Sequence, residues 1–146
     1  MVMSSKNLKK KNSNRQVKYH SKVKIAGVAK SFLNKINNSL CLRACSYGLI
    51  TAQQIETSRR SIRRRLKKTG VLLIRVYPFL TRTVKPLGVR MGHGKASKVR
   101  DQVYPVKPGK IIFQINNVSL NLSKTALSAV QYKLNFSSRI TTLTDF

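Results

Sequence analysis

The chain has 146 residues, and its 30 Lys and Arg against 3 Asp and Glu give a formal net charge of +27 at pH 7. A domain with this excess of cations repels itself unless a polyanion lies against its surface, and nucleic acid fits best because each neutralised phosphate releases condensed counterions. Hydrophobic residues make up 41% of the sequence, enough for one modest core. No apolar run approaches the roughly 20 residues of a spanning helix. The composition indicates one nucleic-acid-binding domain without membrane insertion.

Residues 1–24 are rich in Lys, Asn and Ser, have few apolar positions, and include the cations Lys18 and Lys22. Such a segment cannot bury enough apolar surface to offset the entropy of ordering it. We therefore expect a basic, extended tail that is disordered until RNA binds it, followed by a single domain over residues 25–146. A solvated tail or a targeting extension is the alternative, although transit peptides favour Arg and amphipathic spacing.

The next stretch, residues 25–45, has scattered apolar positions without a clean period, so its structure stays open. It contains both cysteines, Cys41 and Cys45. A closed zinc site needs four ligands, and His20 and His93 lie in unrelated parts of the chain. We expect two ordinary reduced thiols and no metal or other cofactor.

A helix is predicted to begin after Thr51, because Gln54 three positions later completes a capping box, and Gly70 is expected to end it. One side of this helix is apolar at helical spacing. Its members are Ala52, Ile55, Ile62 and Leu66, with the stem of Arg59 on the same stripe.

The other sides of the predicted helix are cationic. They carry Arg60, Arg63, Arg64, Arg65, Lys67 and Lys68. Glu56 is the one acid available, and it can pair with Arg60 at the i, i+4 position. A solvated face is the usual explanation of a charge run, but solvated faces mix signs. This helix is predicted to contact phosphates.

From Val71 the periodicity becomes that of strands. Residues 71–77 (VLLIRVY) form a β-branched and aromatic run between Gly70 and Pro78, which predicts a buried strand. Further strands are predicted at 87–91, 99–106 and 110–115, because Gly, Pro and Asn separate these runs. Ser119 can cap a second helix to about Leu134, and a last strand is predicted at 139–143. This order indicates an α+β fold, with a mixed or antiparallel sheet packed with two helices.

Little in the chain supports catalysis. General acid–base chemistry needs a positioned carboxylate or histidine, and Glu56, Asp101 and Asp145 form no pair at useful spacing. The segment Gly92-His93-Gly94-Lys95 is not a nucleotide-binding loop, because Val89 stands where that motif needs a glycine. We expect no enzyme.

The same loop suits a polynucleotide backbone. Its glycines let the main chain approach a ligand closely and adopt positive φ, while Arg90, His93, Lys95 and Lys98 supply hydrogen-bond donors. A flexible hairpin tip with incidental charge is the alternative.

Several segments together resemble the family of large-subunit ribosomal protein sixteen. Residues 48–60 (GLITAQQIETSRR) and the basic run to Lys68 are similar to the family's first long helix. The runs 74–78 (IRVYP), 85–95 (KPLGVRMGHGK) and 107–113 (KPGKIIF) recur in the family's order, and Asn117-Val118 begin its last helix. The resemblance spans Ser46 to about Leu143.

The resemblance implies a structural constituent of the large ribosomal subunit, bound to its rRNA and to neighbouring large-subunit proteins, close to the A-site tRNA. The rRNA-binding residues would be Arg59, Arg60, Arg63, Arg64, Arg65, Lys67 and Lys68, with Lys18 and Lys22 added by the charge of the tail. The loop Arg90, Met91, Gly92, His93, Gly94 and Lys95 would point toward the peptidyl-transferase region and help position aminoacyl-tRNA.

The N-terminal part departs from the family and is rich in Lys, Asn, Ile and Ser, which indicates a mitochondrial copy. A plastid or the bacterial cytoplasm is the alternative location. The alternative function is a free basic nucleic-acid-binding factor, such as an assembly chaperone or a packaging protein.

Overall fold

The computed structural model describes residues 17–18, 27–29, 39–67, 69–90, 92, 94, 96 and 98–142. In chain order the elements are β1 (Val17–Lys18), β2 (Leu40–Ala44), β3 (Gly48–Thr51), α1 (Ala52–Leu66), β4 (Val71–Ile74), β5 (Leu80–Thr83), β6 (Val99–Val106), β7 (Ile111–Asn116), α2 (Leu120–Gln131) and β8 (Ser138–Thr142). The predicted α+β class, with two helices on mixed or antiparallel sheets, is confirmed.

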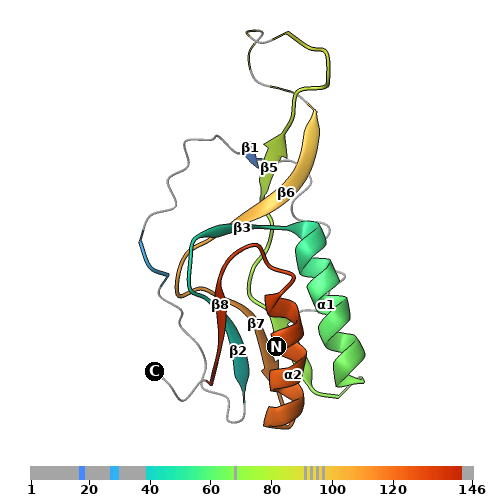
Figure 1. Cartoon of the computed structure of the whole chain (residues 1–146), viewed down its shortest axis with the longest axis vertical. Helices are drawn as coiled ribbons and strands as arrows, with labels where there is room; N and C mark the ends of the chain where they lie inside the picture. The colour runs from blue at the N-terminus through green and yellow to red at the C-terminus, as the bar shows by residue number, and fades with distance from the viewer. Residues whose placement is uncertain are drawn as a thin grey trace.

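The strands form two four-stranded sheets (Figure 1). One has the order β4-β7-β2-β8 and is antiparallel throughout, and the other has the order β1-β5-β6-β3, in which only β1 and β5 run parallel. The helices α1 and α2 pack against each other, and α2 also contacts β2 and β8. The first sheet and the helices thus form the body of the domain.

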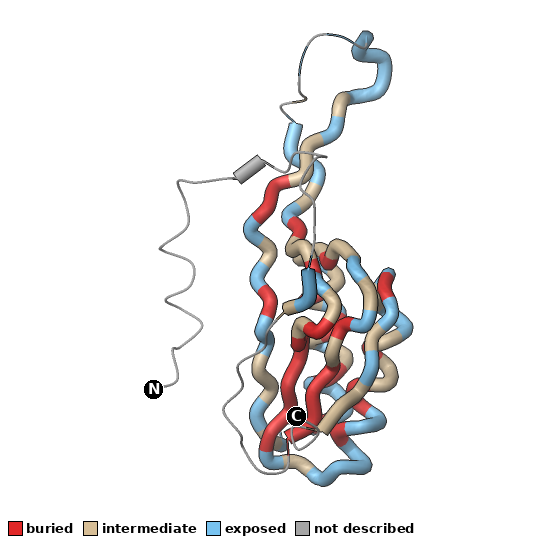
Figure 2. The backbone as a smooth tube through the Cα atoms, turned by 90° about the vertical axis from the view of Figure 1, so that its left-hand side faces the viewer, coloured by how far each residue is buried: buried red, intermediate tan, exposed pale blue. Residues whose placement is uncertain are grey.

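The hydrophobic core lies between this sheet and the helices. Phe113 and Ile115 of β7, Leu127 of α2, and Ile62 and Leu66 of α1 are all completely buried. Every residue of β7 is buried, because this strand lies between β4 and β2 in the interior of its sheet. Burying one such side chain stabilises the fold by about 1.5–3 kcal/mol. Figure 2 shows the buried residues concentrated in the body.

An arm made of β5, β6 and the loop between them extends from the body (Figures 1 and 2). At its stem, Arg82 of β5 donates to Asp101 of β6, with 2.8 Å between Arg82 Nε and Asp101 Oδ1. A backbone hydrogen bond of 2.9 Å, donated by Val84 N to Lys98 O, continues the pairing past β5. Beyond it Leu87 is completely exposed. The arm holds its loop outside the body.

Two strand predictions need correction, and one strand of the arm was not predicted. The predicted buried strand 71–77 is only Val71–Ile74, and Val71 and Ile74 are exposed because β4 pairs on one side only, with β7. The predicted strand 87–91 is wrong over its described part, since Leu87 and Gly88 form a turn and 89–90 carry no strand. The arm's first strand is instead β5, which the sequence pattern missed.

The remaining elements agree closely with expectation or fill segments left open. The strands predicted at 99–106 and 110–115 are β6 and β7, and β8 covers most of the predicted 139–143. The second helix is α2, which ends at Gln131 and not at about Leu134; Ser119 lies at its N-cap, but the Ser119 side chain makes no capping hydrogen bond. β2 lies within the segment for which no element was predicted, and β3 was not predicted either. Val17–Lys18 pairs with β5, whereas the rest of 1–24 lies outside the described residues, so the tail stays a prediction.

Candidate nucleic-acid interface

The start of α1 is built as the sequence predicted. The Gln54 backbone N–H donates to Thr51 Oγ1 at 3.2 Å, and the Thr51 N–H donates to Gln54 Oε1 at 2.9 Å, which completes the capping box. Two N–H groups that the helix itself leaves without partners are thereby satisfied. The helix ends at Leu66, one turn before the predicted Gly70, because Lys67 already takes the left-handed conformation at φ 45°. Both ends of the helix are therefore defined by residues of the sequence, Thr51 and Lys67.

One stripe of α1 faces the core. Ile55, Ile62 and Leu66 are buried as predicted, and Ser58, which was not predicted, is buried with them. Ala52 is only half-buried. Since the stripe packs against α2, the opposite side of α1 must face outward.

Glu56 is bound by two arginines of its own helix. Arg59 Nε lies 2.7 Å and Arg60 Nε 2.9 Å from its carboxylate oxygens, so the predicted pair with Arg60 is confirmed and Arg59 adds a second. The hydrogen bonds from Arg59 and Arg60 lower the pKa of Glu56 to about 2. The hydrogen bond between Arg59 and Glu56 also raises the pKa of Arg59. Because all three side chains are at least two-fifths exposed, each pair contributes about 0–1 kcal/mol.

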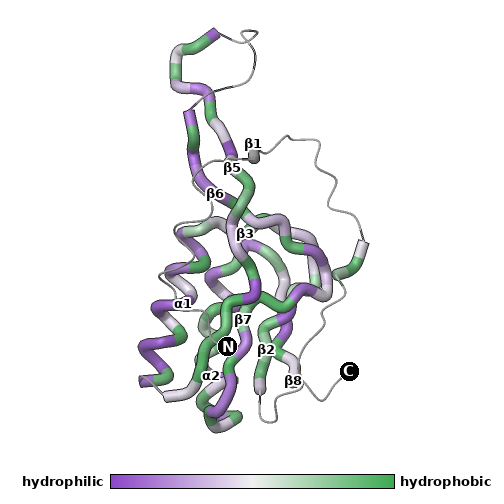
Figure 3. The backbone as a smooth tube through the Cα atoms, turned by 180° about the vertical axis from the view of Figure 1, so that it is seen from behind, coloured by the Kyte–Doolittle hydropathy of each residue, from purple (hydrophilic) through white to green (hydrophobic). Residues whose placement is uncertain are grey.

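The C-terminal half of α1 presents cations that no described carboxylate pairs with. Its exposed members are Arg63, Arg64, Arg65 and Lys67. Arg63 Nη1 lies 3.4 Å from Gly70 O, and Arg65 Nη1 lies 3.1 Å from Ser61 Oγ, so both arginines keep further donors. Figure 3 shows the hydrophilic character of this end of α1. We call these four residues together with Arg60 the α1 basic face.

Other predicted residues are placed only in part. Lys18 lies in β1, but its side chain lies outside the described part of the structure, as do Lys22 and Lys68. In the loop, Arg90 is exposed, and Gly92 and Gly94 have φ values of 114° and 71°, which confirms the predicted positive φ. Met91, His93 and Lys95 lie outside the described residues.

The structure does not bring the α1 basic face and the described residues of this loop into one site. Figure 1 shows the described part of the segment between β5 and β6 at the far end of the arm, away from α1. Lys98 and Arg100 are further exposed cations along the arm, and Lys85 is half-buried there. Lys85 and Arg100 were not predicted as site residues, and the signal that could have found them is a run of cations with Asp101 as the only neighbouring acid.

Both acids of the described residues are engaged. Glu56 is held by Arg59 and Arg60, and Asp101 by Arg82. The α1 basic face and the arm therefore carry a nearly unopposed positive charge. Within the same residues, no group of three His, Cys, Asp or Glu side chains is placed to share a metal ion.

The two cysteines are free thiols, Cys41 buried and Cys45 exposed. Burial raises the pKa of the Cys41 thiol to about 11, so this group stays protonated at neutral pH. Neither helix of the described chain is both long enough and apolar enough to span a bilayer.

The fold is that of a small α+β domain with two cationic surfaces, a charge distribution typical of proteins that bind polyanions. The family model for Ribosomal protein L16p/L10e matches residues 6–141. Proteins called large ribosomal subunit protein uL16 from Acinetobacter baumannii and Acinetobacter baylyi are each 43% identical over 106 residues, which cover 73% of this chain and 77% of theirs. The chain belongs to the ribosomal protein L16p/L10e family, which confirms the resemblance seen in the sequence.

Proposed function

We propose that the chain is a structural constituent of the large ribosomal subunit and that it binds large-subunit rRNA through the α1 basic face. The observation that carries this function is the set of exposed cations on the last two turns of α1, with no described carboxylate paired to Arg63, Arg64, Arg65 or Lys67. Family membership supports it, because the relatives are large-subunit ribosomal proteins by name. The function needs no catalytic group, and we propose that the protein is not an enzyme.

The geometry of α1 suits an RNA backbone. The helix has 15 residues and is therefore roughly 22 Å long, so its cations meet a row of phosphates and not a single one. Arg60 and Arg64 are four residues apart, which places them on one side of the helix, and Lys67 follows at its C-terminal end. The planar guanidinium groups can each donate two parallel hydrogen bonds to one phosphate. The apolar stripe of α1 packs against α2 and so positions the helix that carries these cations.

The arm provides a second, finer proposal. We infer that the loop from Arg90 to Lys95 approaches the A-site tRNA near the peptidyl-transferase centre and helps position its aminoacyl end. The Arg82–Asp101 pair supports this role by tying the two strands of the stem together. The positive φ of Gly92 and Gly94 lets the backbone lie close to a nucleic acid.

The compartment follows from the same family. The relatives are bacterial, so the protein belongs to a ribosome of bacterial or organellar type. We propose the mitochondrial ribosome, because residues 1–24 are rich in Lys, Asn and Ser. Neighbouring large-subunit proteins are the other expected partners.

Equilibrium binding separates this function from a free basic factor. The full chain should prefer large-subunit rRNA over small-subunit rRNA and duplex DNA of equal length at moderate salt. Equal affinity for all three would support the free factor.

The loop has its own test. Arg90→Ala should lower A-site tRNA binding by reconstituted subunits while the protein stays bound to rRNA. Unchanged tRNA binding would remove the arm from the proposal without touching the rRNA-binding face.

A further inference from the structure

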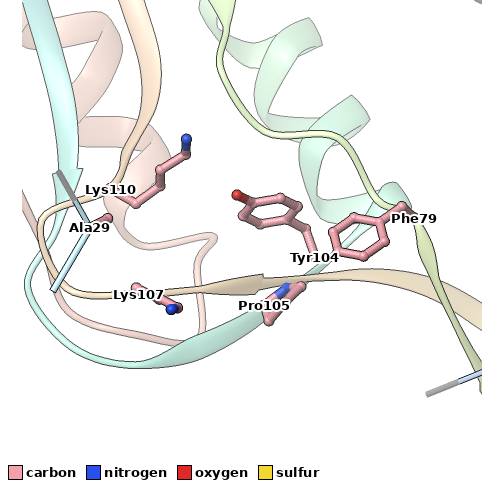
Figure 4. A pocket seen from close by; sticks show the side chains of 6 residues that line it. All are labelled: Ala29, Phe79, Tyr104, Pro105, Lys107 and Lys110. Atoms are coloured by element: carbon pink, nitrogen blue, oxygen red, sulfur yellow. The ribbon is translucent and has the colours of Figure 1, made fainter. Parts of the chain in front are cut away.

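A pocket outside the α1 basic face lies at the junction of β6 with the turn that precedes β7. Its volume is about 260 Å³, and it is lined by Ala29, Phe79, Tyr104, Pro105, Lys107 and Lys110 (Figure 4). None of these residues belongs to the predicted site. Its volume lies below the roughly 300–1,000 Å³ of pockets for drug-sized ligands. The pocket therefore has room for a single small planar group.

Two aromatic rings form one wall of the pocket. The Phe79 and Tyr104 centroids are 5.8 Å apart with an angle of 74° between the rings, so the rings meet edge to face and do not cover one another. Phe79 is 45% exposed, although phenylalanine is among the residue types most often fully buried. Burial raises the pKa of the Tyr104 hydroxyl. Figure 4 shows the Tyr104 ring between Phe79 and Lys110.

Two lysines on a fixed turn form the other wall. In the turn 107–110, Gly109 has a φ of 84°, and Lys110 N donates to Lys107 O at 3.1 Å. The turn is tied to its surroundings by bonds of 2.8 Å from Ala29 N to Pro108 O and from Gly109 N to Ala44 O. The backbone that carries both ammonium groups is thus held in place before any ligand arrives. None of the described residues that line the pocket carries a carboxylate.

We propose that this pocket takes one unpaired nucleotide of RNA, with its base against Tyr104 and Phe79 and its phosphate beside Lys107 and Lys110. Unstacked bases are bound by aromatic faces, and ammonium groups bind the backbone next to them. A paired helix cannot enter a pocket of this size, so the ligand must come from a loop, a bulge or a single strand. This inference rests on the proposed rRNA binding and adds a second, single-stranded contact to it.

The two walls give different signatures in equilibrium binding of the full chain to large-subunit rRNA. Tyr104→Leu should weaken binding by about 5- to 150-fold, the range for removal of one base–aromatic stack, and leave the salt dependence unchanged. Lys107→Gln with Lys110→Gln should lower the log–log salt slope by about 0.7 for each phosphate that is no longer neutralised. Tyr104→Phe should bind like the native chain.

Matched controls lie on α2 and the residues after it, where Tyr132, Lys124 and Lys133 are exposed. Tyr132→Leu, and Lys124→Gln with Lys133→Gln, should leave affinity and slope close to native. Equal effects from pocket and control variants would overturn the proposal.

Photochemical cross-linking of the native chain decides the question even if Tyr104→Leu fails to fold. Ultraviolet irradiation of the full chain bound to large-subunit rRNA should leave a nucleotide adduct on Phe79 or Tyr104. Adducts confined to other residues, or a peptide of a neighbouring protein at this position in intact subunits, would refute it. If the native chain does not bind large-subunit rRNA at all, the proposed function itself is refuted.

Discussion

Removing the charge of the α1 basic face tests the interface most quantitatively. In the variant Arg63→Gln, Arg64→Gln, Arg65→Gln, three exposed cations are removed without disturbing any described salt bridge. Glutamine has nearly the helix propensity of arginine, so the stability of α1 should change by less than about 0.5 kcal/mol. The variant should therefore fold normally and differ only in its charge.

The expected change is in the salt dependence of rRNA binding. Each phosphate that is no longer neutralised lowers the log–log slope by roughly 0.7–0.9, so removing all three arginines lowers it by roughly 2 to 3. Between roughly 50 and 200 mM salt, the affinity of the variant should then fall about 20- to 40-fold less than that of the native chain. Filter binding or fluorescence anisotropy across this range measures both quantities.

A control of equal charge is available outside α1. Lys124→Gln, Lys133→Gln, Arg139→Gln removes three exposed cations of α2, the segment after it and β8. An unchanged slope in the α1 variant, or the same decrease in both variants, would refute the assignment of the interface to α1.

Three further predictions concern the fold that positions this face. Thr51→Ala removes the capping box and should lower the free energy of unfolding in urea by about 0.5–2 kcal/mol, and no change would show that α1 needs no cap. Because the pKa of Glu56 is lowered to about 2, its stabilising effect is present above the ordinary value of 4.5 and lost as the pH falls toward 2. Thermal unfolding should show this loss in the native chain and not in Glu56→Gln, and parallel pH curves would contradict it. Gly70→Ala should destabilise the domain more than Gly88→Ala. Both glycines have positive φ, but of the two only Gly70 has a neighbour that an added Cβ would meet, Val118 Cγ2 at 2.0 Å. Equal destabilisation by the two substitutions would show that the strain of positive φ acts alone.

The sequence predicted the elements whose signals are local. The capping box at Thr51 and Gln54 located the start of α1, because both partners lie within one turn. The run 99–106 was predicted as a strand and is β6, flanked by turn residues on both sides. The cations of α1 were predicted as exposed because its apolar stripe fixed which side faces the core.

The features that the sequence did not predict share one physical cause. They depend on contacts with residues far along the chain. Whether 71–77 is buried depends on a second neighbouring strand, and β4 has only β7. β2 shows no alternating pattern because four of its five residues are buried, and its partners β7 and β8 lie far along the chain. The pocket was missed for the same reason, since Phe79 and Tyr104 come together only when the chain folds.

Burial of polar groups was equally hard to predict. Gln114 is completely buried in β7, where its Oε1 accepts from Arg75 at 2.7 Å and its Nε2 donates to Asn116 at 3.0 Å. These partners satisfy the amide and explain why a polar residue is tolerated there. No sequence pattern indicates such a pairing across strands.

The excess of cations, on this reasoning, holds the chain within a large ribosomal subunit. Sedimentation of ribosomes after a high-salt wash shows whether it does. We expect the chain to remain with the large subunit at one copy per particle. Release of the chain into the soluble fraction, with the other large-subunit proteins retained, would contradict this expectation.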